Sequence, residues 1–454
     1  MRTINKRILL IVAVVVIFLF FTILLAFSMF TNAQEYALKS VNAHLYESGV
    51  LTNAGEIVDT NGIKLAYTQN GERKYNDDPD IRASFLHILG DNKGFISGGI
   101  QDVFKNELSG YNIVYGVNKS SDNTLNLTLD AELCAYAYEE LRPYKGCIAV
   151  CNYKTGELIC IASSPSYDIY NKPENLDSDP DYEGVYINRL YGGLYTPGSI
   201  FKVVTAMAAI ENITDIYNRT FYCNGKDGTI ICNDTHGEIS FKTALNQSCN
   251  VAFAQIAVEL GADKINEAFH SAGLDISYTT NDRITSKSSI ININTSDSKS
   301  DIGWTGIGQS TTLVNPYSFL NFMCAIANGG KSYEPYFVKS AVNENGRKIY
   351  ESTPVDSGIT ITPTTASLLK ELLRSDVSDY YGDYIFGDIT MCGKTGTAER
   401  DNKLPHAWFA GFSYDDDFPY AVIAILEECG SGLKYAGSAA SSVMQELYRK
   451  TISG

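Results

Sequence analysis

The stretch from Ile8 to Phe30 carries no charged side chain and is almost entirely apolar. A helix needs about 20 such residues to cross roughly 30 Å of hydrocarbon, so this stretch predicts a membrane-spanning helix. Three basic residues precede it, and basic residues favour the cytoplasmic side of a membrane. We therefore expect a cytoplasmic tail over residues 1–7, a signal-anchor helix over 8–30 and the rest of the chain outside the cytoplasm.

A cleaved signal peptide is the alternative, because Thr31–Gln34 could serve as a cleavage region. The apolar core of a signal peptide spans about 7 to 15 residues, which is shorter than the stretch found here. An uncleaved anchor is therefore favoured. Because no second hydrophobic span follows, we expect a single-pass protein of the cell membrane. The part after the anchor exceeds one ordinary core, and we expect a domain over 35–125 and another over 127–454.

Charge and composition add two expectations. The formal net charge is −16, and a strongly acidic protein is repelled by nucleic acids and by anionic membrane surfaces, so neither is expected as a binding partner. Residues 281–303 are rich in Ser, Asn and Asp. That composition predicts a mobile surface insertion.

A possible nucleophile and base lie three residues apart in the string Ser199-Ile-Phe-Lys202. A Thr-Pro-Gly break precedes it, and the apolar residues up to Ile210 predict a helix that starts at or near Ser199. Residues three apart share a helix face, so Lys202 would stand beside the Ser199 hydroxyl. Burial would lower the pKa of the lysine and let its amine take the serine proton. A buried helix with a snorkelling lysine gives the same pattern.

The string Ser248-Cys-Asn250 precedes an apolar helix that Gly261 closes. For this string alone, a serine that caps the helix is the favoured interpretation. If Ser248 lies opposite Ser199 in the fold, its hydroxyl could instead relay a proton between Lys202 and a leaving amine, while Asn250 binds the substrate backbone.

The string Lys394-Thr-Gly-Thr397 ends a segment that predicts a β-strand, and two further strands follow it in a meander. An edge strand can bind an extended peptide as an additional strand. Lys394 would then offer its charge to a carboxylate, and Thr395 and Thr397 would offer hydroxyl groups. Alone, Lys-Thr-Gly is also typical of a strand that runs into a turn.

In this order, the three strings resemble the motifs of class B, monofunctional penicillin-binding proteins, the D,D-transpeptidases that cross-link peptidoglycan. The likeness extends from about residue 50 to the end. It includes residues 127–133 at the start of the transpeptidase region, 154–168 in its first hairpin, and 306–316 in a further signature loop. Gln101 departs from the family pattern, in which a glutamate is expected at this position.

The resemblance implies a role for each motif residue. The serine of the first string would be acylated, its lysine would act as base, and two backbone amides, of Ser199 and Thr397, would form the oxyanion hole. The other two strings would complete the cleft. The implied catalytic residues are Ser199, Lys202, Ser248, Asn250 and Lys394, and the implied substrate-binding residues are Thr395, Gly396 and Thr397.

The resemblance also implies the fold and the partners. We expect an α+β domain with an antiparallel sheet flanked by helices, an inserted all-helical subdomain from Ser199 to about residue 380, a small N-terminal α+β pedestal and a final helix over 436–450. The implied ligands are peptidoglycan stem peptides and β-lactam antibiotics, with no cofactor. Fewer than 100 residues precede the transpeptidase region after the anchor, which is too few for a glycosyltransferase domain, so a polytopic membrane glycosyltransferase is a further expected partner.

Other functions are compatible with the same motifs. A D,D-carboxypeptidase differs only in whether water or an amine attacks the acyl-enzyme. A class A β-lactamase needs a glutamate with an asparagine four residues on, and no glutamate between Asn250 and Lys394 has that partner. Class D enzymes normally carry an apolar residue where Asn250 stands. A non-enzymatic scaffold or β-lactam sensor is disfavoured because all the motif residues are intact.

The ten cysteines all lie outside the apolar stretch, where disulfides are possible. Cys223 and Cys232 bracket a predicted turn and are the best candidate pair. No group of cysteines and histidines has the spacing typical of a zinc site, so we expect no metal, and Cys249 is given no chemical role. Buried, inert thiols are expected at Cys147, Cys151, Cys160, Cys324 and Cys392.

Overall fold

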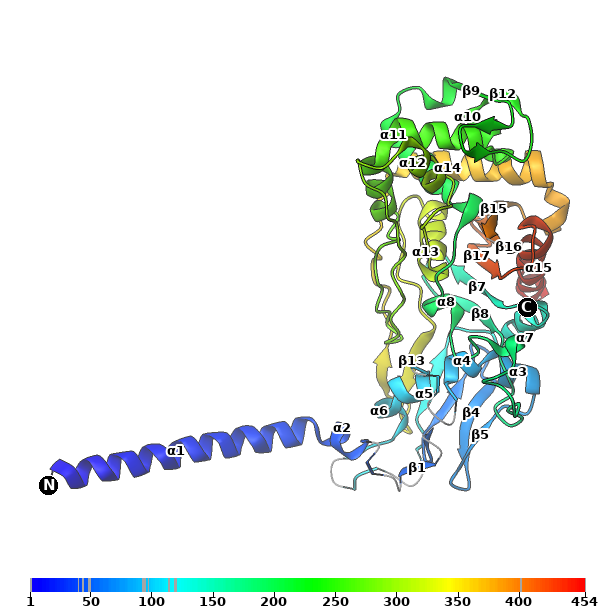
Figure 1. Ribbon diagram of the computed structural model, residues 1–454. Coiled ribbons are helices and arrows are strands. Elements are labelled where there is room, and N and C mark those ends of the chain that lie inside the picture. Colours follow the sequence, from blue (N-terminus) through cyan, green and yellow to red (C-terminus); the bar gives the residue numbers. More distant parts are fainter. Residues whose placement is uncertain are drawn as a thin grey trace.

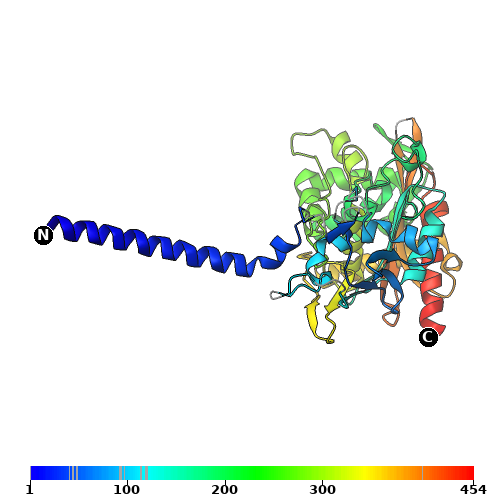
Figure 2. The same ribbon diagram turned by 90° about the horizontal axis from the view of Figure 1, so that it is seen from below.

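The computed structural model describes residues 2–39, 41–42, 45–47, 50–91, 95–96, 98–112, 115–117, 121–400 and 402–453. The first helix, α1 (Arg2–Thr31), extends away from an elongated body (Figures 1 and 2). Within the described residues, Ile4–Thr31 is the one helix that is long and apolar enough to cross a membrane, and none of its most apolar segment is buried in the body. This agrees with the predicted single anchor.

An antiparallel sheet of five strands, in the order β15-β16-β17-β7-β8, forms the centre of the body. Strands from residues 146–164 and 391–426 meet in it, because Leu426 on β17 pairs with Gly146 on β7. The central strands are continuous runs of buried apolar residues. This is expected where both faces of a strand are covered, because polar and apolar residues then do not alternate along it. The strands are β7 (Gly146–Asn152), β8 (Leu158–Ser164), β15 (Met391–Arg400), β16 (Lys403–Ser413) and β17 (Tyr420–Leu426).

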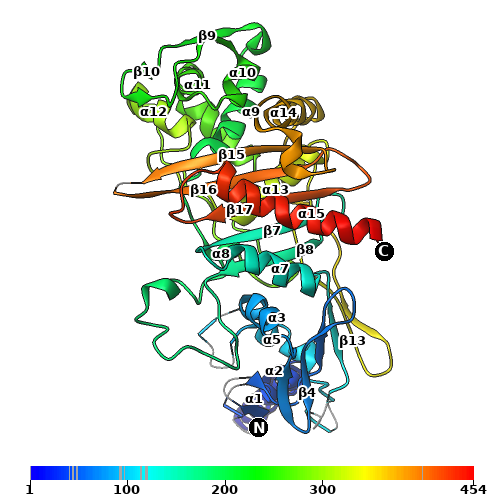
Figure 3. The ribbon, with the colours of Figure 1, turned by 90° about the vertical axis from the view of Figure 1, so that its right-hand side faces the viewer.

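Helices cover both faces of this sheet (Figure 3). The helices α7 (Ala131–Leu141) and α15 (Ser438–Ser453) pack together on one face, and α13 (Pro316–Ala327) packs on the other. Every residue of α13 is buried, which fits a helix enclosed between the sheet and α14 (Pro363–Ser375). The α+β fold with a flanked antiparallel sheet is therefore confirmed.

The block inserted after Ser199 lies at the end of the body that is farthest from α1 (Figure 1). It contains helices as predicted, but the range predicted as all-helical, Ser199 to about residue 380, also contains two short strand pairs here and the strands Val338–Val342 and Lys348–Glu351 elsewhere in the body. Thr220–Cys223 buries alternate residues, which is the period of a strand. The helices are α9 (Lys202–Asn212), α10 (Phe241–Asn246), α11 (Asn250–Ser271) and α12 (Lys299–Gly306), and the strands are β9 (Thr220–Cys223), β10 (Lys226–Asp227), β11 (Ile230–Ile231) and β12 (Gly237–Ser240).

A second sheet, of six strands in the order β14-β13-β6-β3-β4-β5, lies at the end near α1. Two of its strands come from a hairpin far along the chain, so it joins the N-terminal region to the region predicted as the transpeptidase domain. Its strands are β3 (Glu56–Val58), β4 (Lys64–Gln69), β5 (Glu72–Tyr75), β6 (Thr124–Leu127), β13 (Val338–Val342) and β14 (Lys348–Glu351). Short elements around it are α2 (Ala33–Ala37), β1 (Tyr46–Glu47), β2 (Val50–Leu51), α3 (Pro79–Ser84), α4 (Leu86–Leu89), α5 (Ile100–Val103) and α6 (Lys105–Leu108).

The segment 281–303 differs from its prediction. Asp282 is fully buried, and its carboxylate accepts hydrogen bonds from the backbone N–H groups of Phe337 and Val338 at the start of β13. Residues 299–303 belong to α12. The start of the segment is therefore anchored by a buried carboxylate, which its composition did not indicate, whereas most residues from 290 to 301 are exposed, as their composition predicts.

Candidate active site

Ser199 lies in a tight turn that two glycines allow. Gly198 has φ +55°, and a Cβ atom on it would lie 2.7 Å from the carbonyl oxygen of Thr397. On its other side, a Cβ on Gly308 would lie 2.1 Å from the carbonyl oxygen of Gly198. The backbone before Ser199 is thus held between β15 and the loop at Gly308, which places the motifs of Ser199 and Thr397 side by side.

The predicted helix has two parts. Residues Gly198–Phe201 form a 3₁₀ turn, and the α-helix α9 begins at Lys202. A 3₁₀ helix has three residues per turn, so residues i and i+3 are eclipsed. Lys202 therefore lies directly above Ser199, with 3.1 Å between Nζ and the serine Oγ. The predicted proximity of these two side chains is confirmed.

The amine of Lys202 has no contact with bulk solvent and is surrounded by oxygens. Its Nζ lies 2.6 Å from the carbonyl oxygen of Ser248, 2.7 Å from Oδ1 of Asn250 and 3.1 Å from Oγ of Ser248. A neutral amine has two N–H donors and one lone pair. When the carbonyl oxygen and Oδ1 accept the two hydrogens, the lone pair is free to accept the proton of the Ser199 hydroxyl.

Burial lowers the pKa of Lys202 to about 7, because a low-dielectric site disfavours the charged ammonium. The positive charge of Lys394 acts in the same direction. Cys232, Cys249 and Asp376 oppose both effects, but they do not outweigh them. The neutral amine that a general base requires is therefore substantially populated near neutral pH.

Ser248 does not cap the following helix. The N-cap of α11 is Cys249, whose Sγ accepts the backbone N–H of Ala252. Ser248 adopts φ +53°, which is uncommon for a residue with a side chain, and this conformation turns both its carbonyl and its hydroxyl toward Lys202.

Asn250 also differs from expectation, because its side chain was expected to bind the substrate backbone. Its Nδ2 donates to the carbonyl of Ile231 at 2.9 Å, so both ends of its amide bind protein atoms.

Lys394 is also fully buried, and it lies behind the wall of the cleft. Its Nζ donates to the hydroxyl of Tyr381 at 2.9 Å and lies 3.3 Å from Oδ2 of Asp376. Burial alone would lower the pKa of Lys394, but Tyr381 and Asp376 outweigh that effect and raise it. The Tyr381 hydroxyl is 3.0 Å from Oγ1 of Thr395, so Lys394 reaches the cleft through two hydroxyl groups.

Sequence reasoning missed Asp376 and Tyr381. Both belong to the π-helical turn Asp376–Tyr381, which ends at Gly382 with φ +96°. No motif marks them, because the contact with Lys394 depends on how α14 and its continuation pack on β15. The buried carboxylate stabilises the lysine charge, since an unpaired buried ammonium would be costly.

The cleft in front of these residues has a volume of about 510 Å³. Ser199, Ser248, Asn250, Thr395 and Thr397 all line it, together with residues from α12 and the turn that carries Tyr381. The structure therefore brings the three motifs to one cleft. Gly396 is needed for this approach, because a Cβ on it would lie 2.8 Å from the carbonyl oxygen of Pro197.

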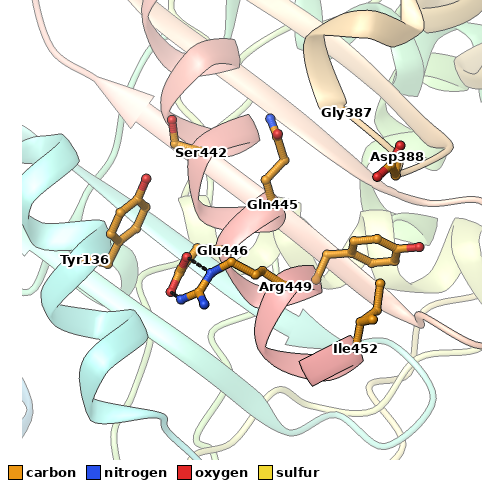
Figure 4. Close-up of a pocket in the computed structure, with 9 residues that line it drawn as sticks. Tyr136, Gly387, Asp388, Ser442, Gln445, Glu446, Arg449 and Ile452 are labelled. Carbon is orange, nitrogen blue, oxygen red and sulfur yellow. Dashed lines mark hydrogen bonds and ion pairs between the residues drawn. The ribbon is translucent and has the colours of Figure 1, made fainter. Parts of the chain in front are cut away.

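A second cavity, of about 500 Å³, lies beside α15 and contains none of the motif residues (Figure 4). Its one marked interaction is the ion pair between Arg449 and Glu446, two neighbours on the same helix. The nucleophile and its amine are absent from its lining, so the cleft at Ser199 is the candidate active site.

The candidate pair Cys223 and Cys232 does not form a disulfide. All ten cysteines are free, including Cys223 and Cys232. The prediction of inert, buried thiols fits the packing, because burial raises the pKa of Cys151, Cys160 and Cys392. Cys223, Cys232 and Cys249 differ from these, because their sulfur atoms converge at one edge of the cleft.

Residues 146–449 match the penicillin-binding protein transpeptidase domain. The chain belongs to this family. Among curated relatives, it is 26% identical over 335 residues to the peptidoglycan D,D-transpeptidase PbpA of Mycolicibacterium smegmatis, a match that covers 65% of this chain and 65% of PbpA. The chain thus spans slightly less than two thirds of the length of that relative.

Solved structures of this family share the fold. The D,D-transpeptidase domain of the peptidoglycan glycosyltransferase from Eggerthella lenta is 24% identical, with a TM-score of 0.75 over 88% of this chain and 98% of that one. Penicillin-binding protein A from M. tuberculosis, solved as a penicillin G acyl-enzyme complex, is 22% identical, with a TM-score of 0.71 over 88% and 99% of the two chains. The present chain therefore has the architecture of the penicillin-binding protein transpeptidase family.

The buried ion pair beneath the cleft generates a stability prediction. Removing one partner of a buried pair costs about 3–5 kcal/mol, so Asp376→Ala should lower the thermal midpoint by at least about 3 °C. Asp379→Ala is the matched control, because Asp379 is paired with Lys242 at the surface, where such a pair contributes about 0–1 kcal/mol. Differential scanning fluorimetry of the detergent-solubilised variants measures the two thermal midpoints. Equal shifts would contradict a supporting role for Asp376.

Proposed function

We propose that this chain is a serine D,D-transpeptidase that cross-links peptidoglycan stem peptides and is acylated by β-lactams. The observation that carries the proposal is the environment of Lys202, a buried amine 3.1 Å from the Ser199 hydroxyl and hydrogen-bonded to the Ser248-Cys-Asn250 string. Membership of the transpeptidase family and the names of the relatives agree with this activity.

In the proposed acylation, Ser199 Oγ attacks the carbonyl carbon of a stem peptide while its proton passes to Lys202 Nζ. Negative charge develops on the carbonyl oxygen, and the backbone amides of Ser199 and Thr397 are proposed to stabilise it. The bond to the leaving amine then breaks. The Lys202 ammonium returns the proton to that amine through the Ser248 hydroxyl, which is 3.1 Å from Nζ.

Deacylation reverses these roles. The amine of a second stem peptide attacks the ester carbonyl and loses a proton, and Ser199 regains one as the ester bond breaks. Lys202 is neutral at the start of each half-reaction, so the same base serves both. A β-lactam would follow only the first half, because its ring opens without releasing a leaving group, and the acyl-enzyme would persist.

The hydroxyl groups at the cleft wall are proposed to bind the substrate carboxylate. Thr395 faces the cleft, and its Oγ1 lies 3.0 Å from the hydroxyl of Tyr381, to which Lys394 donates. The lysine charge therefore polarises these hydroxyl groups and favours an anion in front of them. Thr397 and Gly396 would hold the peptide backbone along β15.

We further propose that α1 anchors the protein in the cell membrane with residues 1–7 in the cytoplasm and the catalytic region outside. The basic residues before the apolar stretch support this orientation. A polytopic membrane glycosyltransferase is the proposed partner, contacted through α1 and the N-terminal region. The family resemblance supports it, together with the exposed phenylalanines of α1, although such residues are equally suited to lipid.

Covalent labelling tests the nucleophile. The full-length protein in detergent should form a one-to-one penicillin adduct that lasts for hours, and peptide mapping by mass spectrometry should place it on Ser199. Ser199→Ala should abolish the adduct and shift the thermal midpoint by no more than a few degrees, because a half-exposed hydroxyl contributes little to the core. The exposed Ser431→Ala variant is the control and should label normally. An adduct on another residue would overturn the assignment, and turnover within seconds would indicate a β-lactamase.

The low pKa of Lys202 generates a pH prediction. Acylation needs the neutral amine, so its rate should rise as the pH passes upward through about 7 and should level off above that value. Lys202→Ala should acylate at least about a hundredfold more slowly, the usual scale for losing a general base. Stopped-flow labelling with a fluorescent penicillin measures the pH dependence of the acylation rate and the rate of the variant. A flat profile between pH 6 and 8, or near-normal labelling of the variant, would mean that another group is the base.

The proposed carboxylate contact can be separated from catalysis. Thr395→Val removes one hydroxyl with little change of shape, and a hydrogen bond to a charged group contributes roughly 1.5–3 kcal/mol. The second-order acylation rate with a carboxylate-bearing penicillin should fall about tenfold or more. The rate with the corresponding methyl ester, which serves as the control, should change much less. Equal losses for both compounds would rule out carboxylate binding by Thr395.

A further inference from the structure

Three cysteines and a histidine converge at the edge of the cleft. Cys223 ends β9, Cys232 follows β11, His236 precedes β12, and Cys249 caps α11. Their ligand atoms all lie within 4.8 Å of one another, and the three cysteines are buried. These residues are between 4 and 26 positions apart along the chain, and they lie next to the ends of four elements of the inserted block.

Three of the distances between these atoms match the edges of a tetrahedral zinc site. The Sγ atoms of Cys232 and Cys249 are 3.9 Å apart, and Nδ1 of His236 lies 3.6 Å from Sγ of Cys232 and 3.4 Å from Sγ of Cys223. With Zn–S near 2.3 Å and Zn–N near 2.0 Å, a tetrahedron has edges of about 3.8 Å between sulfurs and about 3.5 Å between sulfur and nitrogen. A disulfide would require about 2.05 Å between sulfurs.

The backbone around two of the sulfurs is also arranged for thiolates. The N–H of Asn250 donates to Sγ of Cys232 at 3.3 Å, and the N–H of Ala252 donates to Sγ of Cys249 at 3.4 Å. Groups that hydrogen-bond to metal ligands fix their orientation. These two bonds come from the first turn of α11, where free backbone N–H groups favour negative charge.

We propose that Cys223, Cys232, His236 and Cys249 bind one zinc ion, and that this ion holds the Ser248-Cys-Asn250 string in place. Four protein ligands leave no open position on a tetrahedral zinc, so the site is structural and takes no part in bond making. Sequence spacing concealed it: the pattern C-x₈-C-x₃-H-x₁₂-C lacks the closely spaced cysteine pair of familiar zinc motifs.

The proposed ion would act on the active site through Cys249. That residue lies between Ser248 and Asn250, which provide the oxygens that surround the amine of Lys202. A bond from its sulfur to zinc would tie the start of α11 to the β9–β12 hairpin. Asn250 is held from the same side, because its Nδ2 donates to the carbonyl of Ile231, next to Cys232.

Metal content tests this site without reference to catalysis. The full-length protein in detergent, supplied with Zn²⁺ and freed of excess by gel filtration, should hold about one zinc per chain by plasma mass spectrometry. Cys223→Ser should reduce that content at least tenfold. Cys429→Ser is the matched control, because Cys429 is a buried free thiol outside the cluster, and it should retain the metal.

Two further measurements remain decisive if Cys223→Ser does not fold. Zinc-edge X-ray absorption of the wild-type protein should indicate three sulfur ligands and one nitrogen ligand. His236→Gln, at a half-buried position, should lower the zinc content while leaving the protein folded. Zinc content below one tenth of an equivalent in the wild-type protein would overturn the proposal. So would an unchanged content in both variants, or a disulfide between two of the three cysteines in peptide maps of unreduced protein.

The effect on the active site is measured separately and rests on the proposed function. Removing zinc with a chelator should slow penicillin acylation at least tenfold, and adding Zn²⁺ back should restore it. If zinc binds with the expected ligands and acylation does not respond, the metal site stands and its link to Lys202 is overturned. If no adduct forms at all, the proposed activity fails while the metal measurements are unaffected.

Discussion

The active site depends on the burial of one amine. Lys202 has no contact with bulk solvent, and such burial is tolerated only where every polar atom has a partner. The carbonyl oxygen of Ser248 and Oδ1 of Asn250 provide partners for its hydrogens. The 3₁₀ turn at Gly198–Phe201 brings the remaining lone pair to Ser199. The close backbone contacts of Gly198 and Gly308 hold this turn between β15 and the loop at Gly308.

A second buried lysine lies nearby in the opposite charge state. Tyr381 and Asp376 raise the pKa of Lys394. Among the residues that the structure describes, none places a carboxylate within hydrogen-bonding distance of Lys202, and burial lowers the pKa of this lysine to about 7. The positive charge of Lys394 reinforces that lowering. One lysine therefore supplies a permanent positive charge and the other supplies a base, and the difference arises from Tyr381 and Asp376, which pack against only one of them.

The sequence allowed local features to be predicted, and long-range ones only through the family resemblance. The contact between Ser199 and Lys202 follows from three-residue spacing, and the strands after Lys394 follow from their apolar runs. The interpretation of Ser248 as a helix cap, favoured for its string alone, was wrong, because Cys249 caps α11 and Ser248 has a positive φ that spacing does not encode. Asp376, Tyr381 and the buried Asp282 were missed for the same reason, since each binds a partner that is distant along the chain.

The cysteines illustrate why pairs are harder to predict than single residues. A turn between Cys223 and Cys232 suggests a bond between those two alone. In the folded chain, however, His236 and Cys249 approach the same point, because the β9–β12 hairpin folds back on the start of α11. Three thiols and an imidazole leave one sulfur unpaired if any disulfide forms, whereas a tetrahedral metal uses all four. The geometry at the edge of the cleft therefore favours a metal over a disulfide. Through Cys249, the proposed metal would be bound next to Ser248 and Asn250, which hold the amine of Lys202.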